Sequence, residues 1–153
     1  MSVLDTHTGR LVRTIPLAGA TAIALSARTR RVFVRTFYNT VAVLDARNGR
    51  VVKIVPVAPY VRYAISPTSA LAVDEARRRV FVPGDRRTLV LDASTGRVLR
   101  TLAVPGYLVA VNGANGRAFV AADGVSAPPT NSLFGRTGVS SPPRVSSLDL
   151  SRR

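Results

Sequence analysis

A unit of fifteen residues occurs three times in this chain of 153 residues, and this repetition constrains the fold more than any other feature. The copies read VLDTHTGRLVRTIPL from Val3, VLDARNGRVVKIVPV from Val43 and VLDASTGRVLRTLAV from Val90. A weaker fourth copy, SSLDL, surrounds Asp149. The full copies begin 40 and 47 residues apart, which is typical of domains that repeat one supersecondary unit.

A second repeated unit lies between the copies of the first. It reads AIALSARTRRVFV from Ala22, ALAVDEARRRVFV from Ala70 and LVAVNGANGRAFV from Leu108. The three copies have the same length, and each carries a phenylalanine at the same place: Phe33, Phe81 and Phe119.

Both units have the pattern of β-strands. The short runs TVAVLD and RVFV are dominated by β-branched and aromatic residues. We therefore expect an all-β chain in which four antiparallel strands, A to D, form each repeated unit. The first expected strand ends at residue 5 and the second spans 10–17. The others span 22–26, 31–36, 40–45 and 51–57, then 70–74, 79–83, 88–92 and 98–104, and finally 108–112, 117–122 and 144–149.

The turn between strands C and D has the repeated pattern D-x-x-T/N-G-R. A glycine here supplies the positive φ of a tight hairpin, and an aspartate before it accepts backbone N–H bonds of the turn. We assign both sets a structural role: the aspartates are Asp5, Asp45 and Asp92, and the glycines are Gly9, Gly49 and Gly96.

Four-stranded units of about 40 residues are the blades of β-propellers. IALSARTRRVFV followed by TVAVLDARNGRVVKIVPV resembles the YVTN-type repeat of bacterial propellers, and is similar to the repeats of NHL and quinoprotein-like propellers. RVFVRT, RVFVPG and RAFVAA stand where that repeat has VYVTN, so no functional residue is carried over. The resemblance implies a scaffold fold that serves cell-surface, binding and occasionally enzymatic roles.

The strands add up to about three four-stranded blades, fewer than the four of the smallest closed propellers. We expect one partial propeller domain over residues 1–153 that forms an incomplete ring. An open arc exposes an apolar blade face of about 300 Å² at each end, and burying both would contribute about 10 kcal/mol before the cost of association. The expected domain consists of a blade remnant 1–17, blades 18–57 and 70–104, and a blade 107–149 with an insertion at 123–143.

Three arrangements would cover the open faces. Copies of the chain would close one ring, with strands A, B and C at the C-terminal end completed by strand D of a second copy. At three blades per chain, a homodimer would have six blades and a homotrimer nine. Alternatively, the chain is part of a longer propeller, or a different chain supplies the rest.

The net charge of +14 comes almost entirely from arginine, since Lys53 is the only lysine. In a four-strand meander the A–B and C–D turns lie on one face, and eleven arginines fall in these turns. Such a basic rim would bind a polyanion or an acidic partner, whereas the alternative is a solvated set of turns that recurs with the blade. The rim residues are Arg10, Arg28, Arg30, Arg31, Arg47, Arg50, Arg77, Arg78, Arg79, Arg97 and Arg117.

The opposite face carries the B–C and D–A connections and both insertions, residues 58–69 and 123–144. Long loops on a rigid scaffold often carry function, although the Pro, Ser and Gly content of the second insertion fits a poorly ordered loop equally well. We expect ligand or partner contacts from Tyr60, Arg62, Tyr63, Phe134 and Arg136.

The inventory of reactive side chains is small. The chain has no cysteine, a single histidine and eight carboxylates, four of which are the repeated turn aspartates. We therefore predict no catalytic residue, no metal site and no cofactor. No apolar run approaches the roughly 18 residues of a membrane span.

MSVLDTHTGR lacks the pattern of a secretory signal, which leaves two locations open: the cytoplasm, or the cell surface if the chain is part of a longer exported protein. We expect a non-enzymatic binding or scaffold module. The alternatives are an enzyme fragment of a quinoprotein-like or lyase-type propeller, and an electrostatic binder of nucleic acid or another anionic polymer.

Overall fold

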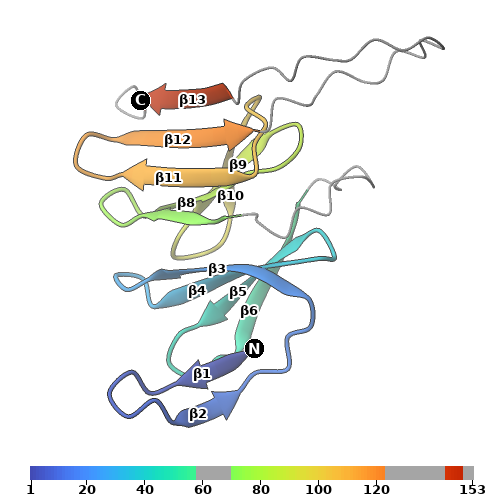
Figure 1. The fold of residues 1–153 in the computed structure, drawn as a ribbon, viewed down its shortest axis with the longest axis vertical. Coiled ribbons are helices and arrows are strands. Elements are labelled where there is room, and N and C mark those ends of the chain that lie inside the picture. Colours follow the sequence, from blue (N-terminus) through green and yellow to red (C-terminus); the bar gives the residue numbers. More distant parts are fainter. Residues whose placement is uncertain (58–69, 123–143, 150–153) are drawn as a thin grey trace, which may run out of the picture.

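The computed structural model describes residues 1–57 and 70–122, and the backbone of residues 144–149. This part of the chain contains thirteen β-strands in four antiparallel sheets and no helix, which confirms the all-β fold with open sheets. The sheets follow one another in chain order along the long axis of the molecule (Figure 1). The N-terminal sheet has two strands, the next two sheets have four each, and the C-terminal sheet has three.

The strands lie where the repeat predicts them. The first sheet contains β1 (Ser2–Leu4) and β2 (Leu11–Thr14). The second contains β3 (Ala20–Ser26), β4 (Arg31–Thr36), β5 (Thr40–Asp45) and β6 (Val51–Pro56). The third contains β7 (Ala72–Asp74), β8 (Arg79–Val82), β9 (Thr88–Asp92) and β10 (Val98–Leu102). The fourth contains β11 (Leu108–Asn112), β12 (Arg117–Ala122) and β13 (Arg144–Asp149).

Some strands are shorter than expected, for local reasons. β2 and β10 end shortly before Pro16 and Pro105, and proline has no N–H with which to continue a ladder. β7 begins at Ala72 instead of Ala70. The Ala70 N–H donates to the carbonyl of Tyr107, 2.9 Å away, so this residue is bonded to the segment before β11 and not to β8.

The two four-stranded sheets repeat the same register between their B and C strands. The phenylalanine of strand B lies opposite a valine of strand C, and the first arginine of strand B lies opposite the turn aspartate. Each sheet therefore presents the same residue types to its neighbours. The matched pairs are Phe33 with Val43 and Arg31 with Asp45 in one sheet, and Phe81 with Val90 and Arg79 with Asp92 in the other.

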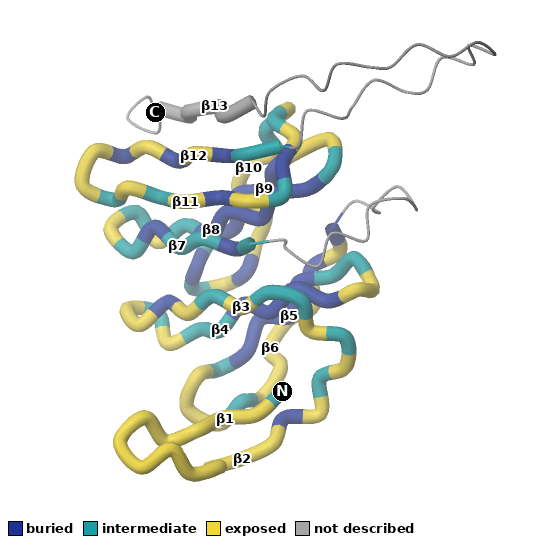
Figure 2. Tube along the Cα trace, viewed as in Figure 1, coloured by how far each residue is buried: buried dark blue, intermediate teal, exposed yellow. Residues whose placement is uncertain are grey.

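The apolar core lies between the sheets, where the buried residues of adjacent sheets meet (Figure 2). Strand B alternates, so that Phe33 faces the third sheet while Val34 faces the first. The three clusters bury roughly one face of a sheet against the next, which is how a blade gains stability from its neighbours. The first cluster includes Ile15, Val34 and Leu44, the second Phe33, Val43, Leu71 and Val80, and the third Phe81, Val90, Val109 and Val120.

The turns differ in the space around their glycines. Gly9, Gly49 and Gly96 all adopt positive φ, of 68°, 69° and 67°. A Cβ on Gly96 would lie 2.8 Å from Val43 Cγ2 in the preceding sheet, whereas a Cβ on Gly9 would meet nothing within 4 Å. The C–D turn of the third sheet is thus tucked against its neighbour, while the first turn is open.

We expect Gly96→Ala to destabilise the protein more than Gly9→Ala. Both substitutions place alanine in the left-handed region, which costs about 1–2 kcal/mol. Only Gly96→Ala also pushes a methyl group into the core between two sheets, which adds about 1–3 kcal/mol. Urea unfolding of both variants measures the difference, and equal losses would contradict the inter-sheet contact.

Candidate functional site

The aspartates of the C–D turns organise the turn backbone. Asp5 Oδ1 accepts hydrogen bonds from the Thr8 N–H at 2.7 Å, the Thr8 hydroxyl at 2.9 Å and the His7 N–H at 3.0 Å. Asp92 Oδ1 accepts the same three kinds of bond, from the N–H and hydroxyl of Thr95 and the N–H of Ser94. These carboxylates are therefore engaged in holding their own turns.

The same bonds shift the acidity of both carboxyls. Hydrogen bonds from the Thr8 N–H, the Thr8 hydroxyl and the His7 N–H lower the pKa of Asp5. Partial burial acts to raise the pKa of Asp92, but the bonds from Thr95 and Ser94, together with the positive charge of Arg78, outweigh it and lower the pKa overall.

Arg31 of the predicted rim links two sheets. Its Nη1 is 2.9 Å from Asp45 Oδ2 in the same sheet, and its Nε donates to the carbonyl of Ser94 in the next sheet at 3.2 Å. Thr29 donates in the same direction, from its hydroxyl to the carbonyl of Ala93 at 2.8 Å. The A–B turn of one sheet is thus fastened to the C–D turn of the next.

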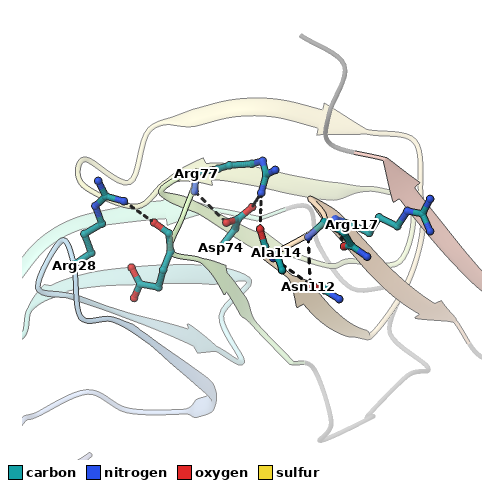
Figure 3. Close-up of polar contacts among 9 residues, drawn as sticks. Arg28, Asp74, Arg77, Asn112, Ala114 and Arg117 are labelled. Atoms are coloured by element: carbon teal, nitrogen blue, oxygen red, sulfur yellow. Dashed lines mark hydrogen bonds and ion pairs between the residues drawn. The ribbon is translucent and has the colours of Figure 1, made fainter.

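Arg77 makes a different link between sheets, one sheet further on. Its Nη1 lies 3.3 Å from Asp74 Oδ2 and donates to the carbonyl of Gly113 at 3.0 Å (Figure 3). The side chain of Asp74 is fully buried, and its Oδ1 also accepts the Arg77 N–H at 3.0 Å. This arginine joins the A–B turns of the third and fourth sheets.

Glu75 is a linking residue that the repeat does not predict, because Ala27 and Gly113 occupy its position in the other copies. Its carboxylate accepts the Ser26 hydroxyl at 2.9 Å and the Ala27 N–H at 2.7 Å, both from the preceding sheet. Because this carboxylate occurs in only one copy of the repeat, the sequence could have indicated a contact specific to that junction.

The predicted basic rim therefore contains two kinds of arginine. Arg31, Arg77 and Arg79 are half-buried, and the first two are engaged in the links between sheets. The remaining eight are exposed, so their charges face solvent along the A–B and C–D turns. The exposed rim residues are Arg10, Arg28, Arg30, Arg47, Arg50, Arg78, Arg97 and Arg117.

The opposite face holds residues that sequence reasoning missed. Phe37 and Tyr38, at the tip of the turn between β4 and β5, are 65% and 73% exposed. Arg35, next to this turn, is buried and donates from Nη1 to the carbonyl of Pro83 in the next sheet. The loop residues predicted to make contacts lie outside the described residues: Tyr60, Arg62, Tyr63, Phe134 and Arg136.

The N-terminal end of the arc exposes residues that are covered in later sheets. Ile23 of β3 is 60% exposed, whereas its counterparts in the repeat, Leu71 and Val109, are each 9% exposed. Leu25 is likewise exposed, while its counterpart Val73 packs against the core between the second and third sheets. The difference arises because the first sheet has only its C and D strands and leaves β3 without facing A and B strands.

A groove of about 390 Å³ occupies this place. It runs between the β1–β2 pair and the second sheet, and its lining is mainly apolar. The lining residues include Val3, Leu4, Val12, Ile23, Leu25, Val32 and Leu44.

The C-terminal end shows the complementary defect. Phe119 is 39% exposed, whereas its counterparts Phe33 and Phe81 are fully buried. Within the described residues no sheet follows the fourth, so the face that carries Phe119 has no neighbour. One end of the arc therefore has an empty apolar groove and the other an exposed phenylalanine.

The described residues contain no cluster of three or more histidine, aspartate or glutamate side chains placed to hold a metal ion. They also contain no helix that is long and apolar enough to cross a membrane.

We expect the turn aspartates to make folding sensitive to acid. Because the pKa of Asp92 is lowered in the folded state, its ionised form favours folding. This stabilisation is complete above the unfolded pKa of about 3.9 and is lost as the pH falls through the lower folded pKa. When the pH is lowered below about 5, the free energy of unfolding, measured with denaturant, should fall less for Asp92→Asn than for the unsubstituted protein. An equally steep fall in both would contradict this role of Asp92.

No family model matches the chain, and no curated protein matches it. Several solved structures match the chain. The chain is similar to dihydro-heme d1 dehydrogenase NirN with a TM-score of 0.63 and 20% identity, over 78% of this chain and 27% of that one. It is similar to BamB from Moraxella catarrhalis with a TM-score of 0.55 and 23% identity, over 76% and 35% of the two chains.

The chain is also similar to the WD40 repeats of RRP9, with a TM-score of 0.56 and 12% identity, over 74% of this chain and 35% of that one. The chain thus spans between 27% and 35% of these three structures. Identities this low carry the fold and not the function. The protein has the β-propeller fold, built here as an arc of open sheets.

Proposed function

We propose that the protein is a non-enzymatic binding or scaffold module that works by association at its two open ends. The partner is a second copy or the rest of a longer propeller, and completion of the ring holds the face loops on a rigid frame. We infer further that its blades are of the YVTN type, on the strength of the repeated sequence units.

The observation that carries this proposal is the contrast between equivalent positions inside the arc and at its ends. Phe33 and Leu71 are buried at an internal junction, while Phe119 and Ile23 are exposed at the two termini of the arc. Exposed apolar faces of this kind mark interaction surfaces in soluble proteins. Covering them stabilises the protein in proportion to the apolar area removed from water.

The engagement of the carboxylates supports a non-enzymatic role. Asp5 and Asp92 hold their own turns, Asp45 and Asp74 pair with arginines, and Glu75 joins two sheets. General acid–base chemistry requires a carboxyl directed at a substrate and not at the backbone of its own turn.

The eight exposed rim arginines favour a second candidate, an electrostatic binder of nucleic acid or another anionic polymer. In this case the A–B and C–D turns would contact phosphate or sulfate groups, and the links made by Arg31 and Arg77 would keep the turns in line.

For the favoured function we expect the purified chain to exceed its 16.3 kDa mass in light scattering after size exclusion. The double variant Ile23→Asp with Phe119→Asp should return it to the mass of one chain, because each change places a charge on an apolar end. Phe37→Asp, at an exposed aromatic on the loop face, is the matched control and should not change the mass. A folded, monodisperse single chain at every concentration would contradict association between copies and leave the rest of a longer propeller as the partner.

For the second candidate we expect binding to heparin or DNA to weaken linearly with the logarithm of salt concentration. Arg30→Gly with Arg78→Gly should reduce that slope by about two phosphate contacts, or roughly 0.9 for each. These turns accept glycine, because Arg30 and Arg78 have φ of 54° and 53° and Gly116 occupies the equivalent position. Arg100→Ser, which removes an exposed arginine of β10, is the control. A slope equal in all three proteins would exclude a rim contact.

A further inference from the structure

We infer that the groove beside β3 receives the β11–β12 hairpin of a second copy of this chain, with Phe119 as the side chain that fills it. This inference rests on the proposed function and names the partner and the contact. Its basis is that the molecule already contains the same contact twice, at its two internal junctions.

At the first internal junction, Phe33 belongs to the same buried cluster as Leu71 and Val80 of the following sheet. At the second, Phe81 belongs to a cluster with Val109 and Ala118. In both cases the phenylalanine of strand B packs with the A and B strands of the next sheet. One receiving position is the second residue of the repeat copy, on strand A or directly before it. The other is the residue just before the phenylalanine, on strand B.

The groove presents those same receiving positions without a phenylalanine. Ile23 and Val32, the counterparts of Leu71 and Val80, both line it. On its other wall lies Val3, which corresponds in the repeat to Val43 and Val90, the residues opposite Phe33 and Phe81 in register. The groove is therefore an internal junction from which strands A and B of one sheet are absent.

β1 supplies the backbone edge for the incoming hairpin. It is bonded only to β2 within the described sheets, so its other edge is open to a strand B. In the complete sheets strand B places an arginine opposite the turn aspartate, and Arg31 and Asp45 form an ion pair of 2.9 Å there. Arg117 of the incoming hairpin would lie opposite Asp5 in the same register.

In the single chain, β13 occupies the position beside β12 that β1 of the second copy would take. β13 pairs with β12 in the register of a C strand, with Arg117 opposite Asp149 and Phe119 opposite Ser147. The copies of strand C read VLD at 3–5, 43–45 and 90–92, but SLD at 147–149. A valine opposite phenylalanine is the better cross-strand partner, so β1 of a second copy is favoured over β13.

The connections to strand C also differ. Three residues, 37–39, join β4 to β5, whereas residues 123–143 separate β12 from β13. A longer connection raises the entropic cost of holding β13 in place within one chain. The shared blade therefore takes β11 and β12 from one copy and β1 and β2 from the other, and β13 is displaced. This arrangement differs from the expectation that only strand D is borrowed, since the groove already includes β1 as one wall.

The contact is head-to-tail, because the two surfaces that meet are different. Each chain contributes two complete sheets and two half-sheets, so two copies close six blades, within the four to eight of ordinary propellers. Three copies would require nine blades. We therefore expect a closed dimer.

The test uses the two ends separately, in about 0.2 M salt so that the charges of two basic chains are screened. Phe119→Asp removes the phenylalanine and leaves the groove, while Ile23→Asp alters the groove and leaves the phenylalanine. Light scattering after size exclusion should show a dimer for the unsubstituted protein and for Phe37→Asp, and single chains for each variant alone. An equimolar mixture of the two variants should form a dimer of one chain of each, because one intact contact remains between them. That recovery also shows that both variants are folded.

A third variant tests the displacement of β13. Ser147→Val gives β13 the residue found in the other copies of strand C, and β13 is displaced in both copies of the dimer. It should therefore weaken dimerisation by up to about fivefold at each of the two contacts, or about 25-fold in the dimer dissociation constant. An unchanged or tighter dimer would overturn the displacement.

The other outcomes separate this inference from the proposed function. A dimer that survives Phe119→Asp, a mixture that does not pair, or a polydisperse series of oligomers would overturn the inference and leave association as the function. An unsubstituted protein that stays a single chain at all concentrations would overturn the inference and leave the rest of a longer propeller as the partner in the proposed function.

Discussion

The packing of one sheet's phenylalanine with the next sheet is the interaction on which the rest of the structure depends. A four-stranded sheet here is apolar on both sides, with Phe33 on one side of β4 and Val34 on the other. Such a sheet cannot be stable alone in water, because either exposed side leaves a large apolar area hydrated. A sheet with two neighbours has both apolar sides covered, whereas a sheet with one neighbour leaves one side exposed to water. The sheets at the two ends of the arc are in the second situation.

Hydrogen bonds and ion pairs between the turns orient neighbouring sheets relative to one another. Arg31, Arg77 and Glu75 each connect the turn of one sheet to the turn of a neighbour, and they differ in chemistry from one junction to another. The apolar contact recurs because it follows from the repeat, whereas the polar contacts are individual. Face-to-face packing is non-directional, so hydrogen bonds of defined geometry at the rim fix how far each sheet is rotated against the next.

The sequence was sufficient for the parts of the fold that depend on local pattern. Strand positions, their grouping into sheets and the place of Gly96 in its turn all follow from the repeat. Contacts between sheets did not follow, because they depend on which residues meet across a junction. Glu75 appeared as an isolated carboxylate, Arg31 and Arg77 appeared only as rim charges, and the exposed pair Phe37 and Tyr38 carried no repeated pattern. The strand count predicted an open apolar face at each end of the arc, but it did not predict which residues line the groove, because Ile23 and its buried counterpart Leu71 occupy the same place in the repeat.

The sheet topology has a consequence for how the chain folds. In each four-stranded sheet the strands are neighbours in space in the order in which they occur in the chain, so every hydrogen-bonded ladder joins consecutive segments. Loop closure for such pairings is short, and contacts between distant parts of the sequence are limited to adjacent sheets. Each sheet can consequently begin to form as soon as its own forty or so residues are available, and it is then a template for the next. Such a chain can therefore acquire structure one sheet at a time, and its stability comes from the contacts between adjacent sheets and not from a single enclosing core.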